Sequence, residues 1–322
     1  MEINVPKYRN ALPQMDGGIF LSDGGLETTL VFHDGMQLPH FASFVLLDTE
    51  AGRRRLKGYY EQYLGISRAR CVGFVLDTAT WRANPDWGAK LGYDADALKA
   101  INVASVALLD ELRAEWESAA TRCVISGQIG PRGDGYKAGN MDAAEAQAYH
   151  APQIAAFAGT SADMVCAYTL TNIDEAIGIA RAAQMHGMPC AISFTVETDG
   201  RLVTGRTLQE AIETTDRETD SYPLYYLINC AHPTHFESAL AAGEPWMKRI
   251  LGVKANASTR SHAELDESDT LDAGDPADLG RRYRALTLSF PTMRILGGCC
   301  GTDHRHVAAI CAACVSPVAL SA

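Results

Sequence analysis

The chain has 322 residues, of which 47% are apolar and 21% charged, which is ordinary for a globular protein and excludes long disordered or fibrous segments. Lys and Arg number 28 against 39 Asp and Glu, so the formal net charge is −11 and the surface repels nucleic-acid phosphates and anionic lipid. No apolar run reaches the ~18 residues of a membrane span, and the first residues lack the apolar run of a signal peptide. We therefore expect a cytoplasmic protein with no nucleic-acid and no membrane partner.

Short apolar segments alternate along the chain with longer segments whose apolar residues recur near a 3.6-residue period. This alternation is typical of a parallel sheet whose strands are connected by helices. Helices are expected over residues 94–116, 143–162 and 276–286. Eight strands are expected over residues 18–22, 73–77, 124–128, 164–168, 190–194, 224–229, 249–254 and 293–296.

Eight β/α alternations in a chain of this length predict an α/β fold of the closed (β/α)8 TIM-barrel type, formed as a single domain over residues 1–322. The alternative is a doubly wound open sheet, which favours a phosphate-binding loop after its first strand. The corresponding turn, SDGGLET at residues 22–28, lacks the G-x-G-x-x-G spacing of such a loop. The sequence therefore favours the barrel.

In such a barrel the active site lies at the carboxyl ends of the strands, so side chains at those ends are candidates for the site. Polar and aromatic residues suited to binding a small substrate lie at or just after the ends of the first four expected strands and at the end of the sixth. The candidates for substrate binding are Asp23, Glu27, Asp77, Thr78, Thr80, Trp81, Gln128, Tyr168 and Asn229.

Three of the nine cysteines fall at these same strand ends: Cys230, Cys299 and Cys300. Glycines flank the adjacent pair and allow the backbone to turn, so that both sulfurs can face one ion. Three thiolates with an open fourth position suit a catalytic Zn²⁺ site, so we predict that these cysteines are the metal ligands and the catalytic centre. A vicinal disulfide between Cys299 and Cys300 is the alternative.

Histidines near these cysteines are competing candidates for the metal. His232 follows Cys230 closely, and His304 and His306 follow the cysteine pair. Thr302 or Asp303 is expected to cap a helix there, which directs the last two histidines into that helix. The other six cysteines are expected to be small buried hydrophobes, including the C-x-x-C at residues 311–314, because it lies within a helical pattern.

An all-thiolate zinc site favours one kind of chemistry. Zinc keeps bound sulfurs deprotonated near neutral pH, and three thiolates with Zn²⁺ sum to one negative charge. That charge keeps the sulfur of a bound substrate thiol nucleophilic and attracts a cationic methyl donor. The site therefore suits alkyl transfer to a thiol better than activation of water, for which imidazole and carboxylate ligands are commoner.

Six motifs agree with this interpretation: DGGLETTL (23–30), TATW (78–81), GQIGP (127–131), ISFT (192–195), NCAHP (229–233) and GGCCGT (297–302). Through them the chain resembles the homocysteine S-methyltransferase family over most of its length. The resemblance implies an eight-stranded barrel, zinc bound by Cys230, Cys299 and Cys300, and methyl transfer to a small thiol such as homocysteine, giving methionine. It also implies that Asp23 helps to bind the amino group of the acceptor.

Two segments depart from the pattern of that family. Its members usually have a Glu at the end of the fourth strand that also binds the acceptor ammonium, where this chain has Tyr168. The missing charge-assisted contact is worth roughly 1.5–3 kcal/mol, unless Asp77 or Glu27 compensates. Tyr168 could instead reach the zinc, offer a ring face with Trp81 to a cationic donor, or simply pack at the barrel mouth. The segment KANAST (254–259) replaces a Pro-Asn-rich turn, so donor recognition is also expected to differ.

We therefore expect a zinc-dependent S-methyltransferase whose partners are a small-molecule thiol acceptor and a methyl donor. A sulfonium donor is favoured over an ammonium donor, because the chain lacks the long C-terminal arm of betaine-dependent relatives. The alternative is a zinc- or thiol-binding member of the family without methyl-transfer activity or with a non-homocysteine acceptor. A hydrolase is disfavoured by the thiolate ligands, and a homo-oligomer is left open.

Overall fold

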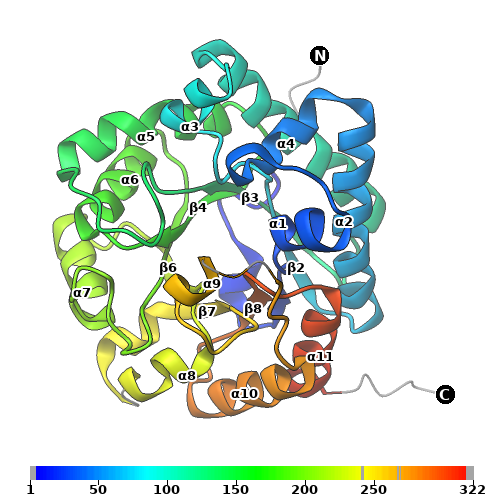
Figure 1. The fold of residues 1–322 in the computed structure, drawn as a ribbon, viewed down its shortest axis with the longest axis vertical. Helices are drawn as coiled ribbons and strands as arrows, with labels where there is room; N and C mark the ends of the chain where they lie inside the picture. The colour runs from blue at the N-terminus through cyan, green and yellow to red at the C-terminus, as the bar shows by residue number, and fades with distance from the viewer. Residues whose placement is uncertain (1–4, 241–242, 267, 269, 317–322) are drawn as a thin grey trace.

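The computed structural model describes residues 5–240, 243–266, 268 and 270–316. Its eight strands form a closed barrel in which every strand is parallel to its neighbours and β8 pairs with β1 (Figure 1). The predicted barrel is therefore confirmed, with a strand in each of the eight predicted segments. The strands are β1 (Phe20–Leu21), β2 (Gly73–Asp77), β3 (Cys123–Ile129), β4 (Met164–Leu170), β5 (Cys190–Phe194), β6 (Tyr225–Asn229), β7 (Ile250–Ala255) and β8 (Ile295–Gly298).

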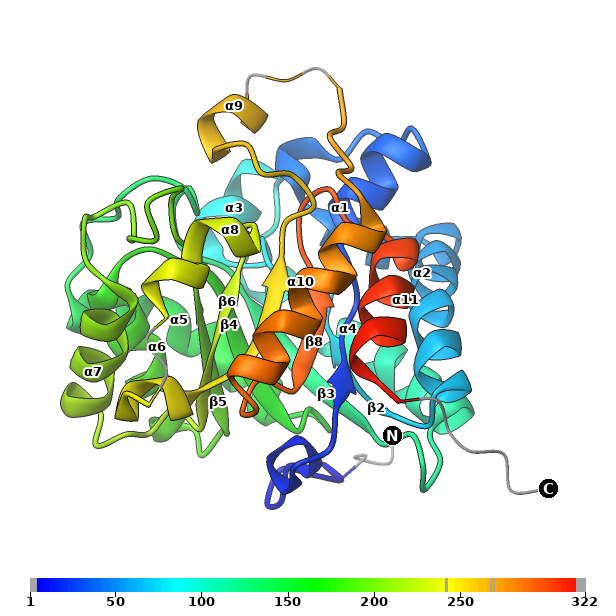
Figure 2. The ribbon, with the colours of Figure 1, turned by 90° about the horizontal axis from the view of Figure 1, so that it is seen from below.

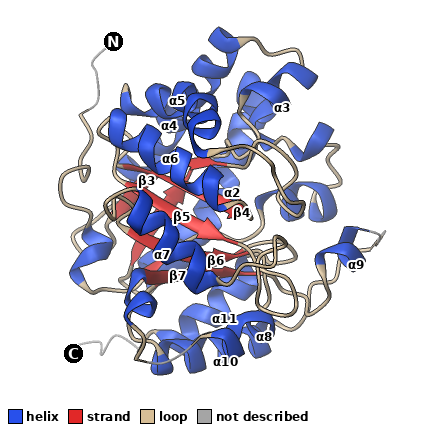
Figure 3. Cartoon of the chain, turned by 90° about the vertical axis from the view of Figure 1, so that its left-hand side faces the viewer, coloured by secondary structure: helices blue, strands red, loops and turns tan. Residues whose placement is uncertain are grey.

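Helices connect the strands and form a ring around the barrel (Figures 1 and 3). Three of them, α4, α5 and α10, confirm the helices predicted from sequence, although α5 ends at Ala158, just before Gly159. Among the described residues, no helix combines the length and apolarity needed to cross a membrane. The α-helices are α1 (Leu26–Thr28), α2 (Glu50–Ala69), α3 (Pro85–Lys90), α4 (Ala95–Trp116), α5 (Ala143–Ala158), α6 (Ile173–Met185), α7 (Leu208–Glu218), α8 (Pro233–Phe236), α9 (His262–Asp266), α10 (Pro276–Ser289) and α11 (His304–Cys314).

The helix α4 illustrates why these segments become helices that cover the barrel. Asp94 caps its start, because the carboxylate accepts a hydrogen bond of 2.9 Å from the backbone N–H of Ala97. Leu98, Leu109 and Leu112 are buried in the apolar cluster between the helices and the outside of the barrel. Burial of each such side chain contributes about 1.5–3 kcal/mol, so the apolar stripe holds the helix on the sheet.

A second apolar cluster fills the inside of the barrel. Its members include Leu12 from the N-terminal segment, and the neighbouring buried Gln14 lies with its Nε2 3.3 Å from the Tyr225 hydroxyl. Figure 2 shows this N-terminal segment at one end of the barrel and α9 at the other. The packed end holds the starts of the strands, so the carboxyl ends beneath α9 are where a substrate can enter. The strand residues of the cluster include Phe20, Val75, Val124, Met164, Leu227 and Ile295.

A β-bulge in β7 determines which of its side chains face the barrel interior. Tyr226 of β6 pairs with Ile250, but Leu227 pairs with Gly252, so β7 carries one extra residue at this point. Leu251 lies in the interior cluster and Val253 in the outer one. The bulge therefore reverses the alternation of the strand and turns Lys254 inward, where strict alternation from Leu251 would turn it outward.

Gly252 has no room for a side chain at this bulge, which yields a stability prediction. A Cβ there would lie 2.7 Å from the Ile295 carbonyl oxygen and 2.8 Å from the Leu227 side chain. We expect Gly252→Ala to lower the free energy of unfolding by about 1–3 kcal/mol, as overpacking does, in urea denaturation. The control Gly58→Ala, in an open position of α2, should raise it by roughly 0.5–1 kcal/mol. Equal stability of the two variants would contradict the close packing of the bulge.

Candidate active site

The structure brings together the three cysteines predicted to bind metal. Cys230 directly follows β6, and Cys299 and Cys300 directly follow β8, while β7 lies between these strands and pairs with both. The three sulfurs lie within 4.8 Å of one another, and the Cys230 and Cys300 sulfurs are 3.9 Å apart. Within the described part of the chain, this is the one group of three or more Cys, His, Asp or Glu side chains close enough to share a metal ion.

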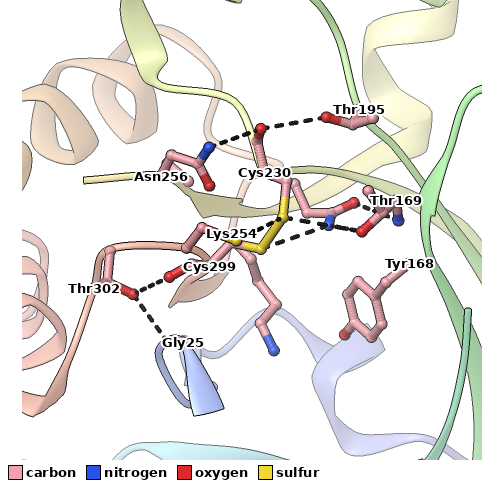
Figure 4. Close-up of a disulfide and its surroundings, with 12 residues drawn as sticks. Gly25, Tyr168, Thr169, Thr195, Cys230, Lys254, Asn256, Cys299 and Thr302 are labelled. Atoms are coloured by element: carbon pink, nitrogen blue, oxygen red, sulfur yellow. Dashed lines mark hydrogen bonds between the residues drawn. A yellow bond between two sulfur atoms is a disulfide. The ribbon is translucent and has the colours of Figure 1, made fainter. Parts of the chain in front are cut away.

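A disulfide joins Cys230 to Cys299 (Figure 4). The alternative considered from sequence, a vicinal bond between Cys299 and Cys300, is therefore wrong, because Cys299 is bonded across β7 to the end of β6 instead. A sulfur in a disulfide is not a thiolate, so the oxidised and the metal-binding forms of the cluster exclude each other. The arrangement is an oxidised form of the three-cysteine cluster.

The backbone at the ends of β4 and β6 adopts a conformation that non-glycine residues rarely take. Thr169 has a φ of 63° and Cys230 a φ of 51°, both in the left-handed region. The Cys230 carbonyl oxygen accepts hydrogen bonds from Asn256 Nδ2 at 3.0 Å and from Thr195 Oγ1 at 3.3 Å (Figure 4). It also accepts one from the His262 ring. Such strained positions persist when surrounding contacts hold them, and they concentrate at functional sites.

Polar groups also contact the sulfurs directly. The Asn229 amide donates to the Cys299 sulfur at 3.9 Å, and the Thr169 hydroxyl donates to the Cys230 sulfur at the same distance. Asn229 is itself held, because its Oδ1 accepts from the Thr169 backbone N–H at 2.9 Å and from the Ser193 hydroxyl at 2.6 Å. The Tyr136 hydroxyl lies 3.7 Å from the Cys300 sulfur. These contacts orient the sulfur atoms toward the barrel mouth.

A cavity of about 370 Å³ opens beside the cluster at the barrel mouth. This volume is within the usual range for small-molecule sites. Of the nine residues predicted to bind substrate, six line it: Asp23, Glu27, Trp81, Gln128, Tyr168 and Asn229. The cavity is also lined by all three cysteines and by Phe41, Tyr60, Arg82, Asp134, Tyr136 and Lys254.

The other three predicted residues, Asp77, Thr78 and Thr80, are buried beneath the cavity and do not line it. The two threonine hydroxyls lie 2.6 Å apart and bond to the backbone of Gln128, with Thr78 accepting from its N–H and Thr80 donating to its carbonyl oxygen. The two threonines therefore support the end of β3 and do not line the cavity, and their predicted role in substrate binding stays a prediction. The position of a residue at the end of a strand predicts that it lies at the active-site end of the barrel, but not whether its side chain reaches the cavity.

The floor of the cavity holds a buried ion-pair cluster. Lys254 Nζ donates to Asp23 Oδ1 at 2.7 Å and to Asp77 Oδ2 at 3.0 Å, and all three side chains are less than 10% exposed. The Tyr168 hydroxyl donates to the same Asp77 oxygen at 2.9 Å, and the Tyr59 hydroxyl donates to Asp23 Oδ2 at 3.1 Å. A buried carboxylate pair is costly without a cation, and Lys254 offsets one of the two negative charges.

Burial and these charges shift the pKa values of the floor residues. Burial raises the pKa of Asp23, and the lowering effect of Lys254 only partly offsets it. Burial alone would lower the pKa of Lys254, but the two carboxylates outweigh it, so the net shift is upward and the ammonium stays charged. Burial also raises the pKa of Glu27, which accepts a 2.8 Å hydrogen bond from Ser43.

The aromatic residues considered for a cationic donor already hold cations of the protein. Lys254 Nζ lies 4.9 Å from the centre of the Tyr168 ring, and the Arg82 guanidinium lies 4.1 Å from the Trp81 ring. The Tyr168 hydroxyl points to Asp77 and away from the sulfurs (Figure 4). A cation of the protein therefore already lies against each ring, and the Tyr168 hydroxyl is hydrogen-bonded to Asp77 at the cavity floor.

The histidines considered as competing ligands lie outside the sulfur cluster. The His232 ring hydrogen-bonds to Thr234 at the start of α8, and burial lowers its pKa to about 4. His304 and His306 lie in the first turn of α11, which Asp303 caps as predicted. His306 bonds to Asp303 and to the Ala273 carbonyl oxygen. Cys311 is buried and Cys314 half-buried in the same helix, and they form no disulfide. The expectation that all six remaining cysteines are buried is wrong for Cys71, which is exposed.

Several residues of the cavity and its floor were not predicted as site residues, among them Lys254, Tyr59, Arg82 and Tyr136. Lys254 had a signal, because a charged residue ends the apolar strand RILGVKA, but the bulge that turns it inward has no motif. Tyr59 comes from α2, and its role depends on helix packing that periodicity alone does not reveal. Arg82 directly follows the TATW motif, whereas nothing in the sequence around Tyr136 indicates its position beside Cys300.

Comparisons with known proteins agree with this fold. The sequence profile of the homocysteine S-methyltransferase family matches residues 20–314. The Escherichia coli homocysteine methyltransferase MmuM in its oxidised form superposes with a TM-score of 0.74 at 20% identity, covering 95% of this chain and 99% of that one. Its metallated form gives a TM-score of 0.68 at 22% identity, covering 92% of this chain and 97% of that one. No curated protein sequence matches the chain significantly.

The floor cluster predicts a pH-dependent loss of stability in Lys254→Met. This variant leaves two buried carboxylates without their cation, so we expect unfolding to require about 3–5 kcal/mol less near pH 7.5. Without Lys254 the folded-state pKa of Asp23 rises further above its unfolded value, so the deficit should shrink as the pH falls toward 5 and Asp23 gains a proton. Denaturation curves at both pH values test this, and a deficit independent of pH would contradict it.

Proposed function

The chain belongs to the homocysteine S-methyltransferase family, and from that premise we propose that its reduced form binds zinc through Cys230, Cys299 and Cys300 and methylates a small thiol such as homocysteine, giving methionine. The observation that carries the proposal is the position of the three sulfurs, which lie together at the wall of a cavity in the barrel mouth. The methyl donor is a sulfonium or ammonium compound.

The geometry of the sulfurs suits zinc. Zn–S bonds of about 2.3 Å at tetrahedral angles place two sulfur ligands about 3.8 Å apart. The Cys230 and Cys300 sulfurs are 3.9 Å apart, so they already have the spacing of two ligands of one ion. Cys299 joins them once its bond to Cys230 is reduced to two thiols. Three protein ligands leave the fourth tetrahedral position for a substrate.

The chain's own residues prepare the reaction around this centre. When zinc is bound, it supplies Lewis acidity that keeps an acceptor thiol deprotonated near neutral pH. Asn229 and Thr169 orient the ligand sulfurs through their hydrogen bonds. In the reaction itself, the acceptor sulfur forms a bond to the donor methyl carbon as the bond from that carbon to the donor heteroatom breaks. The donor loses its positive charge and leaves as a neutral product.

The cavity wall is suited to a cationic donor. Glu27 and Asp134 contribute carboxylates to the lining, and Phe41, Tyr60 and Tyr136 contribute aromatic side chains. Carboxylates and aromatic rings both attract sulfonium and ammonium groups. The attraction weakens when the methyl group has been transferred and the charge is gone, which favours release of the product.

Zinc binding and turnover should fail together in Cys299→Ser, because the hydroxyl of serine is not deprotonated as readily as a thiol. We expect zinc per chain, measured by atomic emission after reduction, to fall from about one to well below it, and methyl transfer to fall more than about 100-fold. Cys71→Ser, at an exposed cysteine outside the cluster, is the matched control and should retain both. Full activity in metal-stripped wild-type protein would contradict the proposal.

Oxidation should switch zinc binding off. With the Cys230–Cys299 disulfide in place the protein has lost two of its three ligands, so we expect it to bind no stoichiometric zinc. Reduction with a phosphine should restore one zinc per chain, and bound zinc should protect these two cysteines from alkylation, as peptide mass spectrometry can measure. Stoichiometric zinc in protein that still carries the disulfide would show that the metal binds elsewhere.

A further inference from the structure

The ammonium of Lys254 hydrogen-bonds to Asp23, the carboxylate that is expected to bind the amino group of the acceptor. Asp23 is the residue that the family resemblance assigns to the amino group, and its Oδ1 accepts a 2.7 Å hydrogen bond from Lys254 Nζ. The other oxygen of Asp23 accepts from the Tyr59 hydroxyl at 3.1 Å. Both oxygens of this carboxylate are therefore engaged by groups of the protein.

Two further contacts hold Lys254 in this position. Asp77 accepts from Nζ at 3.0 Å on its opposite side, and the Tyr168 ring packs beneath the ammonium, with 4.9 Å between Nζ and the ring centre. Tyr168 stands where the family usually has a Glu for the acceptor ammonium, and its hydroxyl donates to Asp77. Tyr168 therefore contacts Lys254 and Asp77, whereas a Glu at this position would attract the cation of a substrate.

A second ammonium cannot easily join this cluster. The two carboxylates and the lysine still sum to one negative charge, so the obstacle is local: both Asp23 oxygens are engaged. A second ammonium would have to displace Lys254 from Asp23 or lie beside it, where two like charges repel strongly at low dielectric. Lys254 lies near the carboxyl end of β7, after the bulge that turns it inward, and its side chain is 6% exposed. The lysine is therefore a built-in part of the floor and not a mobile surface group.

We propose that Lys254 is a specificity-determining residue that supplies, from within the protein, the ammonium partner of Asp23, so that the site selects a small thiol without requiring an amino group on it. The inference rests on the proposed function and refines its acceptor class. Homocysteine remains a substrate, but its amino group contributes little to binding. Thiols of similar size that lack the amino group are then equally good acceptors.

The test compares homocysteine with 4-mercaptobutyrate, which is homocysteine without its amino group. Isothermal titration of the reduced, zinc-loaded protein, without methyl donor, should give dissociation constants within about threefold of each other. In Lys254→Met the freed carboxylates should favour homocysteine by about tenfold to a hundredfold, the range of a charge-assisted hydrogen bond. Lys248→Met, at an exposed lysine outside the cavity, is the control and should keep the wild-type ratio.

The wild-type ratio decides the inference even if Lys254→Met does not fold. Tenfold or tighter binding of homocysteine by the wild type would overturn it, and loss of that preference in Glu27→Gln would assign the amino group to Glu27, the other carboxylate near the floor. Methyl transfer from a sulfonium donor is measured separately with both thiols. Equal binding without transfer would reject the proposed function, whereas transfer with a strong preference for homocysteine would reject only the role of Lys254.

Discussion

The pairing of β7 with β6 on one side and with β8 on the other determines where both halves of the site lie. In this register Lys254 is level with Asn229 on β6 and with Gly297 on β8. The residues that follow these two neighbours are Cys230 and the Cys299–Cys300 pair, so the sulfurs meet above the end of β7. Because the barrel closes through pairing of β1 with β8, Asp23, which follows β1 closely, lies within hydrogen-bond distance of the same lysine. One set of parallel pairings therefore builds both the sulfur cluster and the charged floor.

The two halves differ in how they use charge. In the proposed function the sulfur cluster acts through the negative charge of its thiolates, which would attract a metal ion and a cationic donor. The floor does the opposite, because Lys254 compensates two buried carboxylates that would otherwise be costly. In the reduced form that we propose, a substrate would meet a floor whose negative charge Lys254 partly offsets and a wall that carries thiolates. This separation favours a thiol directed toward the sulfurs over an amino group directed toward the floor.

Much of this architecture could be predicted from the sequence, for identifiable reasons. The eight strands are short apolar runs between amphipathic segments. The last of them ends in the glycines and cysteines of GGCCGT. The inward turn of Lys254 was not predictable, because it depends on one extra residue in β7 that leaves no mark in the pattern. The burial of Asp77, Thr78 and Thr80 beneath the cavity and the bond between Cys230 and Cys299 depend on side-chain depth and on redox state. Neither property is encoded in spacing along the chain.

X-ray absorption at the zinc edge tests the central claim most directly, because it counts the atoms bound to the metal. For the reduced, zinc-loaded protein the account predicts three sulfur ligands at about 2.3 Å and one lighter atom, changing to four sulfurs when an acceptor thiol is added. A first shell dominated by nitrogen and oxygen, or one that does not change with the thiol, would contradict it. That result would mean that Cys230, Cys299 and Cys300 do not form the centre at which the thiol is methylated.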